Sequence, residues 1–226
     1  MIENEFEWTH ESGRIVKRLS KDKVVSLYQG HEIASHTFTH PYMDNLSESE
    51  ILYKLQSDKA NLEKLFGREV KGFAVPFDYY SDLIEKCVKQ AGFSYARISE
   101  ESHSFTPQAD YFKWKATVLH TDSNLKELTQ QFIISDNELA LFQIVGHSYD
   151  LDIENMWDRI ESIFIEITSQ KAVLPMTTIE TIEYLKAMNQ TEITDSYIKN
   201  NSNISLWFSV NRNAFELKPF EMLFFK

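Results

Sequence analysis

Histidines that stand where predicted strands end are the side chains of this sequence with the clearest chemical potential. His36 and His40 follow the short apolar pair Ile33–Ala34, and Pro41 prevents regular structure from continuing. Neutral imidazoles four residues apart at the end of a strand can bind one divalent ion, each through one ring nitrogen. Two hydrogen-bonded loop histidines would have the same spacing, so the pair alone leaves both interpretations open.

A further histidine, His147, ends the apolar stretch 139–147, which is the strongest strand signal in the chain. Barrel enzymes place their catalytic groups at the carboxyl ends of strands, so His147 is a candidate catalytic residue. A core histidine bonded to a backbone carbonyl is the alternative. Asp150, three residues further on, could orient an imidazole or could simply stand at the start of a helix.

These histidines belong to an ordered set of motifs that resembles the polysaccharide deacetylase (NodB-homology) family of metal-dependent carbohydrate esterases. The H-[ST]-x-x-H motif of that family is matched by 36–40, and its proline motif by Phe73–Phe77. Its last motif, an apolar strand that ends in histidine, is matched by Leu141–His147. The resemblance covers roughly residues 14–188, and only the histidine motif is specific by itself.

The resemblance implies a hydrolase that removes N-acetyl or similar acyl groups from a carbohydrate, and so acts on a carbon–nitrogen bond that is not a peptide bond. It implies that His36 and His40 hold a divalent metal, with zinc as the first expectation, and that His147 protonates the departing amine. The side chains expected to bind the substrate are Pro76, Phe77, Trp114 and Tyr149.

One departure from the family pattern bears on activity. The family opens with a strand that ends in a pair of aspartates, one a base and the other a metal ligand, and no such pair precedes His36. Glutamates are available before residue 14, but they lie in no apolar strand; Asp78 is the nearest carboxylate in sequence, and we expect it to cap a turn. Loss of a positioned base typically lowers a rate by about 10²–10⁴-fold, and two imidazoles alone hold an ion weakly. The glutamates concerned are Glu3, Glu5, Glu7 and Glu11.

Two interpretations follow from this departure. In the first, the sequence is N-terminally truncated, starts after the first β/α unit of an active metal-dependent deacetylase, and lacks only its aspartate pair. In the second, the chain is a remnant of the deacetylase fold that binds carbohydrate or a partner without turnover. In either case a barrel that lacks one unit has an open strand edge, which predicts a homo-oligomer that covers this edge.

The composition excludes several other classes of protein. The 226 residues include 42% hydrophobic and 13% aromatic residues, enough for a buried core. A net charge of −11 argues against nucleic-acid binding, and no apolar run reaches the length of about 20 residues that a membrane span needs. The acidic start lacks the features of a signal peptide, so the chain as written is expected in the cytoplasm. The single cysteine, Cys87, excludes an internal disulfide and is expected in the core.

Helical and strand patterns alternate along the first 188 residues and predict an α/β fold with a parallel sheet. Together with the resemblance, they predict a distorted, incomplete (β/α) barrel over residues 1–188 and a small β appendage over 189–226. Strands are predicted at 31–36, 70–77, 94–98, 112–119, 139–147 and 172–176, and helices at 20–28, 47–66, 81–90, 124–134, 154–168 and 178–188.

Overall fold

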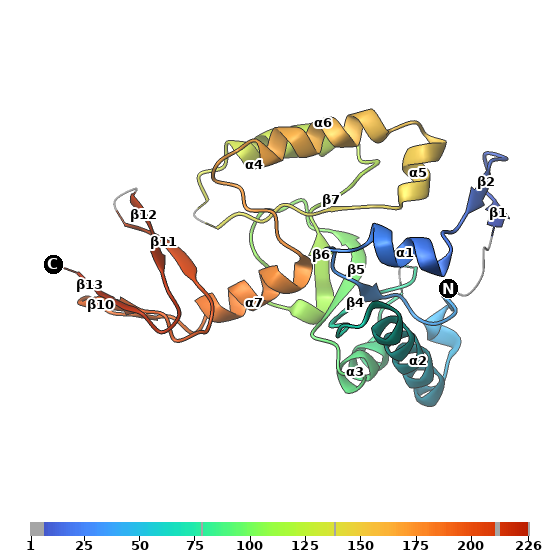
Figure 1. Cartoon of the computed structure of the whole chain (residues 1–226), viewed down its shortest axis with the longest axis horizontal. Helices are drawn as coiled ribbons and strands as arrows, with labels where there is room; N and C mark the ends of the chain where they lie inside the picture. The colour runs from blue at the N-terminus through green and yellow to red at the C-terminus, as the bar shows by residue number, and fades with distance from the viewer. Residues whose placement is uncertain (1–6, 78, 138, 211–212, 226) are drawn as a thin grey trace. The chain divides into compact units, whose positions relative to one another are not determined.

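The structure, a computed structural model, describes residues 7–77, 79–137, 139–210 and 213–225 (Figure 1). The chain divides into two compact units, Met1–Pro175 and Met176–Lys226. This boundary lies one helix earlier than the expected division after residue 188. No helix in the described part of the chain is both long enough and apolar enough to cross a membrane.

The first unit is built on parallel strands. Four of them form one sheet in the order β3-β4-β5-β6, and β7 and β8 form a separate parallel pair. Because helices connect these strands, the predicted α/β class is confirmed. The strands are β3 (Ala34–Ser35), β4 (Gly72–Ala74), β5 (Tyr95–Glu101), β6 (Trp114–Ala116), β7 (Val118–Leu119) and β8 (Ile144–Val145).

Several strands are shorter than their apolar patterns predicted. The stretch 139–147 contains only β8, because Leu141 bonds through its N–H to the Phe105 carbonyl and Gln143 to the Thr117 hydroxyl, outside any strand ladder. The strand predicted at 172–176 does not form, and Leu174 is 68% exposed there. Apolar composition indicated burial at these positions, but no strand in the described residues pairs with the second segment.

Helices cover the parallel strands, and their ends follow the capping signals. The Ser47 hydroxyl accepts from the Glu50 N–H (3.4 Å), and the Glu50 carboxylate accepts from the Ser47 N–H (2.8 Å), as the capping box predicted. Gly67 ends the same helix in the left-handed conformation (φ 66°). The helices are α1 (Lys21–Leu27), α2 (Glu48–Phe66), α3 (Asp82–Gln90), α4 (Leu125–Ile133), α5 (Ser148–Ile153) and α6 (Trp157–Thr168), with short 3₁₀ turns η1 (Met43–Asn45) and η2 (Tyr111–Lys113).

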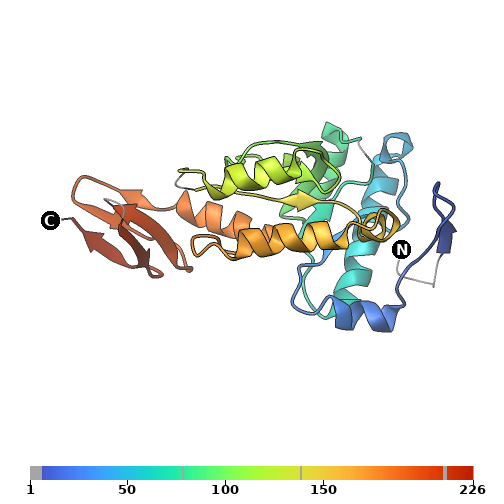
Figure 2. The same cartoon turned by 90° about the horizontal axis from the view of Figure 1, so that it is seen from above.

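Two clusters of buried side chains form the core of this unit. The first joins β4 to α2 and α3 around Phe73, which is fully buried, and includes Cys87 as predicted. The second joins β7 to α4 and α6, which lie side by side in both views (Figure 1 and Figure 2), and contains Val118 and Ile160. The first cluster fixes the strands that lead to His36, and the second fixes those that lead to His147.

An N-terminal hairpin was not predicted. Its strands, β1 (Glu7–Thr9) and β2 (Ile15–Lys17), pair antiparallel around a turn in which Gly13 has φ 80°. Each strand is only three residues long and mostly exposed, so it leaves no hydrophobic period in the sequence.

The second unit combines α7 (Thr178–Met188) with five short antiparallel strands. The Tyr184 hydroxyl of α7 accepts a hydrogen bond from the Trp207 N–H (2.9 Å), which explains why α7 clusters with these strands. The side-chain amide of Asn200, which is fully buried, donates to three backbone carbonyls and holds two loops together. The strands are β9 (Glu192–Ile193), β10 (Tyr197–Lys199), β11 (Leu206–Val210), β12 (Asn213–Leu217) and β13 (Met222–Phe224).

Candidate active site around three histidines

His36 lies directly after β3 and is fixed at two points. Its ring Nδ1 lies 2.8 Å from the carbonyl oxygen of Ala74, at the end of the neighbouring strand β4. Its backbone N–H donates to Asp58 (3.0 Å), a buried carboxylate of α2 that also accepts from the Ser35 hydroxyl (2.7 Å). The Nδ1 contact leaves Nε2 as the ring nitrogen that can bind an ion or substrate, which is how metal-ligating histidines are usually oriented.

Electrostatics keep the imidazole of His36 neutral. Burial lowers its pKa to about 4, and the charges of His40 and Arg97 lower it as well. The hydrogen bond to the Ala74 carbonyl acts in the opposite direction and raises the pKa. Burial also lowers the pKa of His40, helped by the charges of Arg18 and His147. At neutral pH both rings therefore carry a free lone pair, the state that a metal ligand requires.

His40 lies beside His36 at the edge of an exposed aromatic group. The two imidazole rings have centroids 4.6 Å apart, and the His40 ring lies 4.5 Å from that of Phe77. The Phe77 ring in turn stacks on Tyr42 at 3.9 Å with an angle of 8° between the planes. Thr37, His40 and Phe77 all have positive φ (67°, 54° and 54°), so the two loops carry backbone strain at this point.

His147 follows β8 and leads into α5. Its Nδ1 lies 3.1 Å from Oδ2 of Asp150, and its side chain is 63% exposed. The same carboxylate oxygen faces Nε2 of His120 at 3.8 Å; this nitrogen is buried and has no hydrogen-bond partner in the described part of the chain. Asp150 therefore lies between two imidazoles and orients the exposed one, His147, toward solvent.

The two halves of the site lie close together. The charge of His147 contributes to the lowered pKa of His40, which places the ends of β3 and β8 in one electrostatic neighbourhood. Tyr149 stacks on His147 at 4.8 Å and meets the edge of Trp8 at 5.2 Å, so the N-terminal hairpin also contacts this site. The structure thus brings together the three histidines that the sequence selected.

The imidazole pair fits a divalent ion, but it is an incomplete ligand set. In the described part of the chain, no Asp or Glu joins His36 and His40 in a group of three metal-binding side chains. Glu3, Glu5 and Asp78 lie outside the described residues. The positive charges that lower the two histidine pKa values also oppose a cation. Zinc sites commonly use three or four protein ligands, so these two imidazoles alone predict weak binding.

Two expected substrate contacts are corrected by the structure. Trp114 is 1% exposed, and its indole N–H donates to the Gln143 side chain (2.7 Å), so it is a core residue. Pro76 is also buried. Phe77 is 38% exposed, and Tyr149 is partly exposed. These last two aromatics remain available to a ligand.

Sequence reasoning missed several residues that shape the site. Asp58 lies 22 residues from His36, and its helical spacing from Leu55 and Leu62 was a signal that this polar residue is buried. His120 is 5% exposed, and its ring faces Asp150 at 3.8 Å. Tyr42 is an aromatic residue directly after Pro41, and its place beside the histidine motif could have marked it as part of the site. Trp8 lies in the hairpin, far in sequence from any motif, and nothing marked it.

The lowered pKa of His36 predicts a pH-dependent stability. Between pH 6.5, the ordinary pKa, and about pH 4, the unfolded chain binds a proton that the folded chain does not. This contribution is therefore fully present above pH 6.5 and is lost as the pH falls toward 4. We expect the free energy of unfolding to fall by about 1–2 kcal/mol from this residue between pH 7 and pH 5.

Urea unfolding at the two pH values, in EDTA, measures this loss. The His36→Gln variant lacks the titrating group and should lose less stability than the wild type on acidification. Equal losses in the two proteins would contradict the assignment of the pH dependence to His36.

Comparison with known proteins agrees with the motifs. Residues 12–96 match the family model for polysaccharide deacetylase, and this segment includes the histidine and proline motifs. The chain is 37% identical over 70 residues to the peptidoglycan-N-acetylglucosamine deacetylase of Bacillus cereus, covering 30% of this chain and 31% of that protein. It is 31% identical over 81 residues to the chitooligosaccharide deacetylase of Azorhizobium caulinodans, covering 35% and 39%. Residues 12–96 of this chain are thus similar to polysaccharide deacetylases, as the motifs predicted.

Solved structures include more distant neighbours. The family 4 carbohydrate esterase from Streptomyces lividans in complex with acetate has 15% identity and a TM-score of 0.45, covering 71% of this chain and 76% of that one. A protein from Bacillus anthracis, described as a pseudoenzyme of the same esterase family, has 18% identity and a TM-score of 0.37, covering 62% and 47%. The matches to the two curated deacetylases span only a third or so of their lengths.

Proposed function

We propose that this chain acts on an N-acetylated carbohydrate and hydrolyses the carbon–nitrogen bond between the sugar amine and its acyl group. The observation that carries the proposal is the convergence of His36, His40 and His147 from the ends of two strands, in a chain with deacetylase motifs. We also infer that β3 to β8 form part of a distorted barrel of the NodB type, with the site at the carboxyl ends of the strands.

His147 is the proposed proton donor. Hydrolysis of an acylated amine needs a proton on the departing nitrogen, and an exposed imidazole held by a carboxylate can supply it. Asp150, 3.1 Å from Nδ1, accepts the Nδ1–H, so the proton given to the departing nitrogen is the one that Nε2 holds when the ring is protonated. Asp150 is thus a positioning residue, while His147 touches the reacting atoms.

Exposed aromatic rings are the proposed carbohydrate-binding surface. Phe77 and Tyr42 form a stacked pair with 38% and 61% exposure beside His40. Aromatic faces present a large apolar area at low conformational cost, which suits the apolar face of a sugar ring. Tyr149 extends this surface on the His147 side.

His36 and His40 are the residues that would hold a divalent ion, zinc first among the candidates. When bound, such an ion polarises an acyl carbonyl and lowers the pKa of water. The two imidazoles are neutral and rigidly placed, which supports this role. Since no described carboxylate completes the set, the ion should bind weakly and be needed in excess in an assay.

The second candidate function is carbohydrate binding without turnover. It is favoured by a specific observation: in the described residues, no third His, Cys, Asp or Glu joins His36 and His40 in a metal-binding group. Asp58 is buried and already accepts two hydrogen bonds, so it cannot serve as the base.

Acetate release from N-acetylglucosamine oligomers tests the proposal. We expect release by the wild type in excess zinc or cobalt, and no release in EDTA or by the His36→Ala/His40→Ala variant. Oligomer binding by the wild type without any release would favour the second candidate. Neither binding nor release would reject both candidates.

A further inference from the structure

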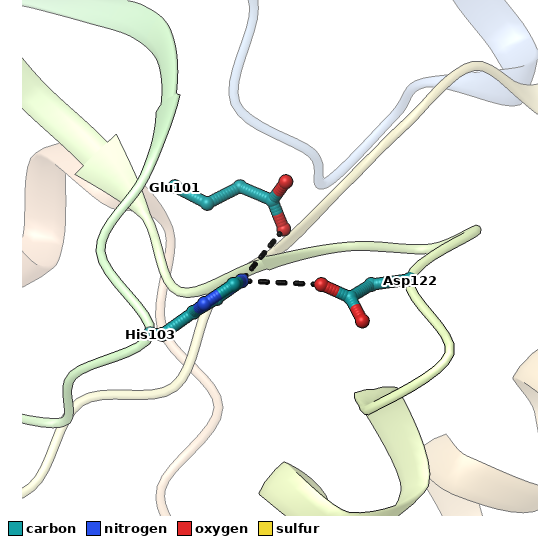
Figure 3. Close-up of side chains that lie close together, drawn as sticks. All are labelled: Glu101, His103 and Asp122. Atoms are coloured by element: carbon teal, nitrogen blue, oxygen red, sulfur yellow. Dashed lines mark hydrogen bonds and ion pairs between the residues drawn. The ribbon is translucent and has the colours of Figure 1, made fainter.

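A second group of metal-binding side chains lies outside the three-histidine site. Glu101, His103 and Asp122 face one another (Figure 3), with Nε2 of His103 3.3 Å from Oε2 of Glu101 and 3.1 Å from Oδ2 of Asp122. One ligand atom from each lies within 4.8 Å of the others. In the described ranges of the chain, this is the one group of three such side chains that meets this criterion.

The chain fixes each of these side chains before any ligand binds. Glu101 is the last residue of β5, and its carboxylate accepts from the Leu119 N–H at the end of β7 (2.6 Å). The backbone N–H of His103 donates to the Thr117 carbonyl (3.0 Å). Asp122 lies in the turn after β7, where its other carboxylate oxygen accepts from the Asn124 N–H (2.6 Å). The three groups are therefore preorganised, and the free-energy cost of ordering them on ligand binding is small.

The distances match those of ligands around a small divalent ion. Nitrogen and oxygen ligands about 2.1 Å from an ion lie about 3.0–3.4 Å from one another in octahedral or tetrahedral geometry. The separations of 3.1 and 3.3 Å from the His103 nitrogen are in this range. Without a cation, the one ring nitrogen faces two carboxylates with at most one hydrogen.

The solvent exposure of the three side chains suits an ion that keeps open coordination positions. The His103 side chain is 50% exposed, whereas those of Glu101 and Asp122 are 20% and 15% exposed. The two carboxylates are thus partly withdrawn from water, while the imidazole faces solvent. Water can complete the coordination on the exposed side, as in sites with three protein ligands.

We propose that Glu101, His103 and Asp122 form a divalent transition-metal site, separate from His36 and His40. One imidazole with two carboxylates favours zinc or manganese over calcium and magnesium, because the last two bind through oxygen alone. This site has three protein ligands where the imidazole pair has two, so it is the tighter metal site of the described chain. Its ion would also link the end of β5 to the turn after β7.

Calorimetry with zinc on the full chain tests this proposal. We expect one tight site in the wild type that persists in the His36→Ala/His40→Ala variant. His103→Gln and Asp122→Asn should each weaken it at least tenfold. Glu100→Gln is the matched control, because it removes a neighbouring carboxylate that is paired with Lys115 and should leave affinity unchanged.

A second measurement keeps the proposal falsifiable if one variant fails to fold. Cobalt in place of zinc should give an absorption spectrum that the His103→Gln variant loses, and the ring signals of His103 in NMR should broaden or shift on metal addition. Tight binding that is lost only with His36 and His40, or no binding with unchanged His103 signals, would overturn the proposal. In the latter case the group is an ion pair of an imidazolium with two carboxylates.

Discussion

Replacing His147 by glutamine is expected to lower the rate of acetate release by about 10²–10⁴-fold, the usual cost of removing a positioned acid or base. Glutamine keeps the polarity and approximate size of the side chain but cannot deliver a proton at neutral pH. Because the His147 side chain is 63% exposed, the fold should be unaffected. Steady-state kinetics on an N-acetylglucosamine oligomer should show the loss in kcat with little change in KM.

His31→Gln is the matched control for this experiment. It makes the same exchange at an exposed histidine whose ring contacts Tyr28, away from the three-histidine site. The control should retain wild-type rates. A His147→Gln variant as active as His31→Gln would remove His147 from the proposed chemistry, whatever the role of the other two histidines.

The second large effect is expected at Gly146, the residue before His147. A Cβ atom at this position would lie 1.8 Å from Nδ1 of His120, which is buried and cannot easily move. Overpacking of this kind typically costs about 1–3 kcal/mol, so Gly146→Ala should lower the free energy of unfolding by about that amount. Urea unfolding in a constant buffer measures it.

A double-mutant cycle identifies the cause of that loss. His120→Ala removes the ring with which the new methyl group would collide, so Gly146→Ala should cost much less in the His120→Ala background. We expect a coupling energy of at least about 1 kcal/mol, in the range seen for residues in contact. Simple additivity of the two changes would show that the strain at Gly146 does not come from His120.

Local signals predicted the helices well. The capping box at Ser47 and the left-handed Gly67 bound α2 as predicted, because caps act over three or four residues. Five of the six strands predicted before residue 188 form in the predicted order, most of them with other lengths, and the one at 172–176 does not form. Parallel pairing depends on a partner far away in sequence, and Leu174 shows that an apolar segment without one stays exposed.

The sequence predicted the reactive residues of the site but not the residues that hold them in place. The three histidines carry motif signals, whereas Asp58 and His120 act through contacts with residues 22 to 30 positions away. Trp114 was expected to bind substrate because the family resemblance implied it, but burial is decided by tertiary packing. His103 matched no motif, and only the fold brings its ring between two carboxylates.

The central claim is that one site containing His36, His40 and His147 recognises an N-acetylated glycan. Histidine ring signals in NMR, followed during titration with an N-acetylglucosamine tetramer in EDTA, test it most directly, because the result does not depend on turnover. We predict that the ring signals of these three histidines shift together with one dissociation constant, while that of His31 stays fixed. Unchanged signals from all three, or a shift of His147 that is independent of the other two, would contradict the claim.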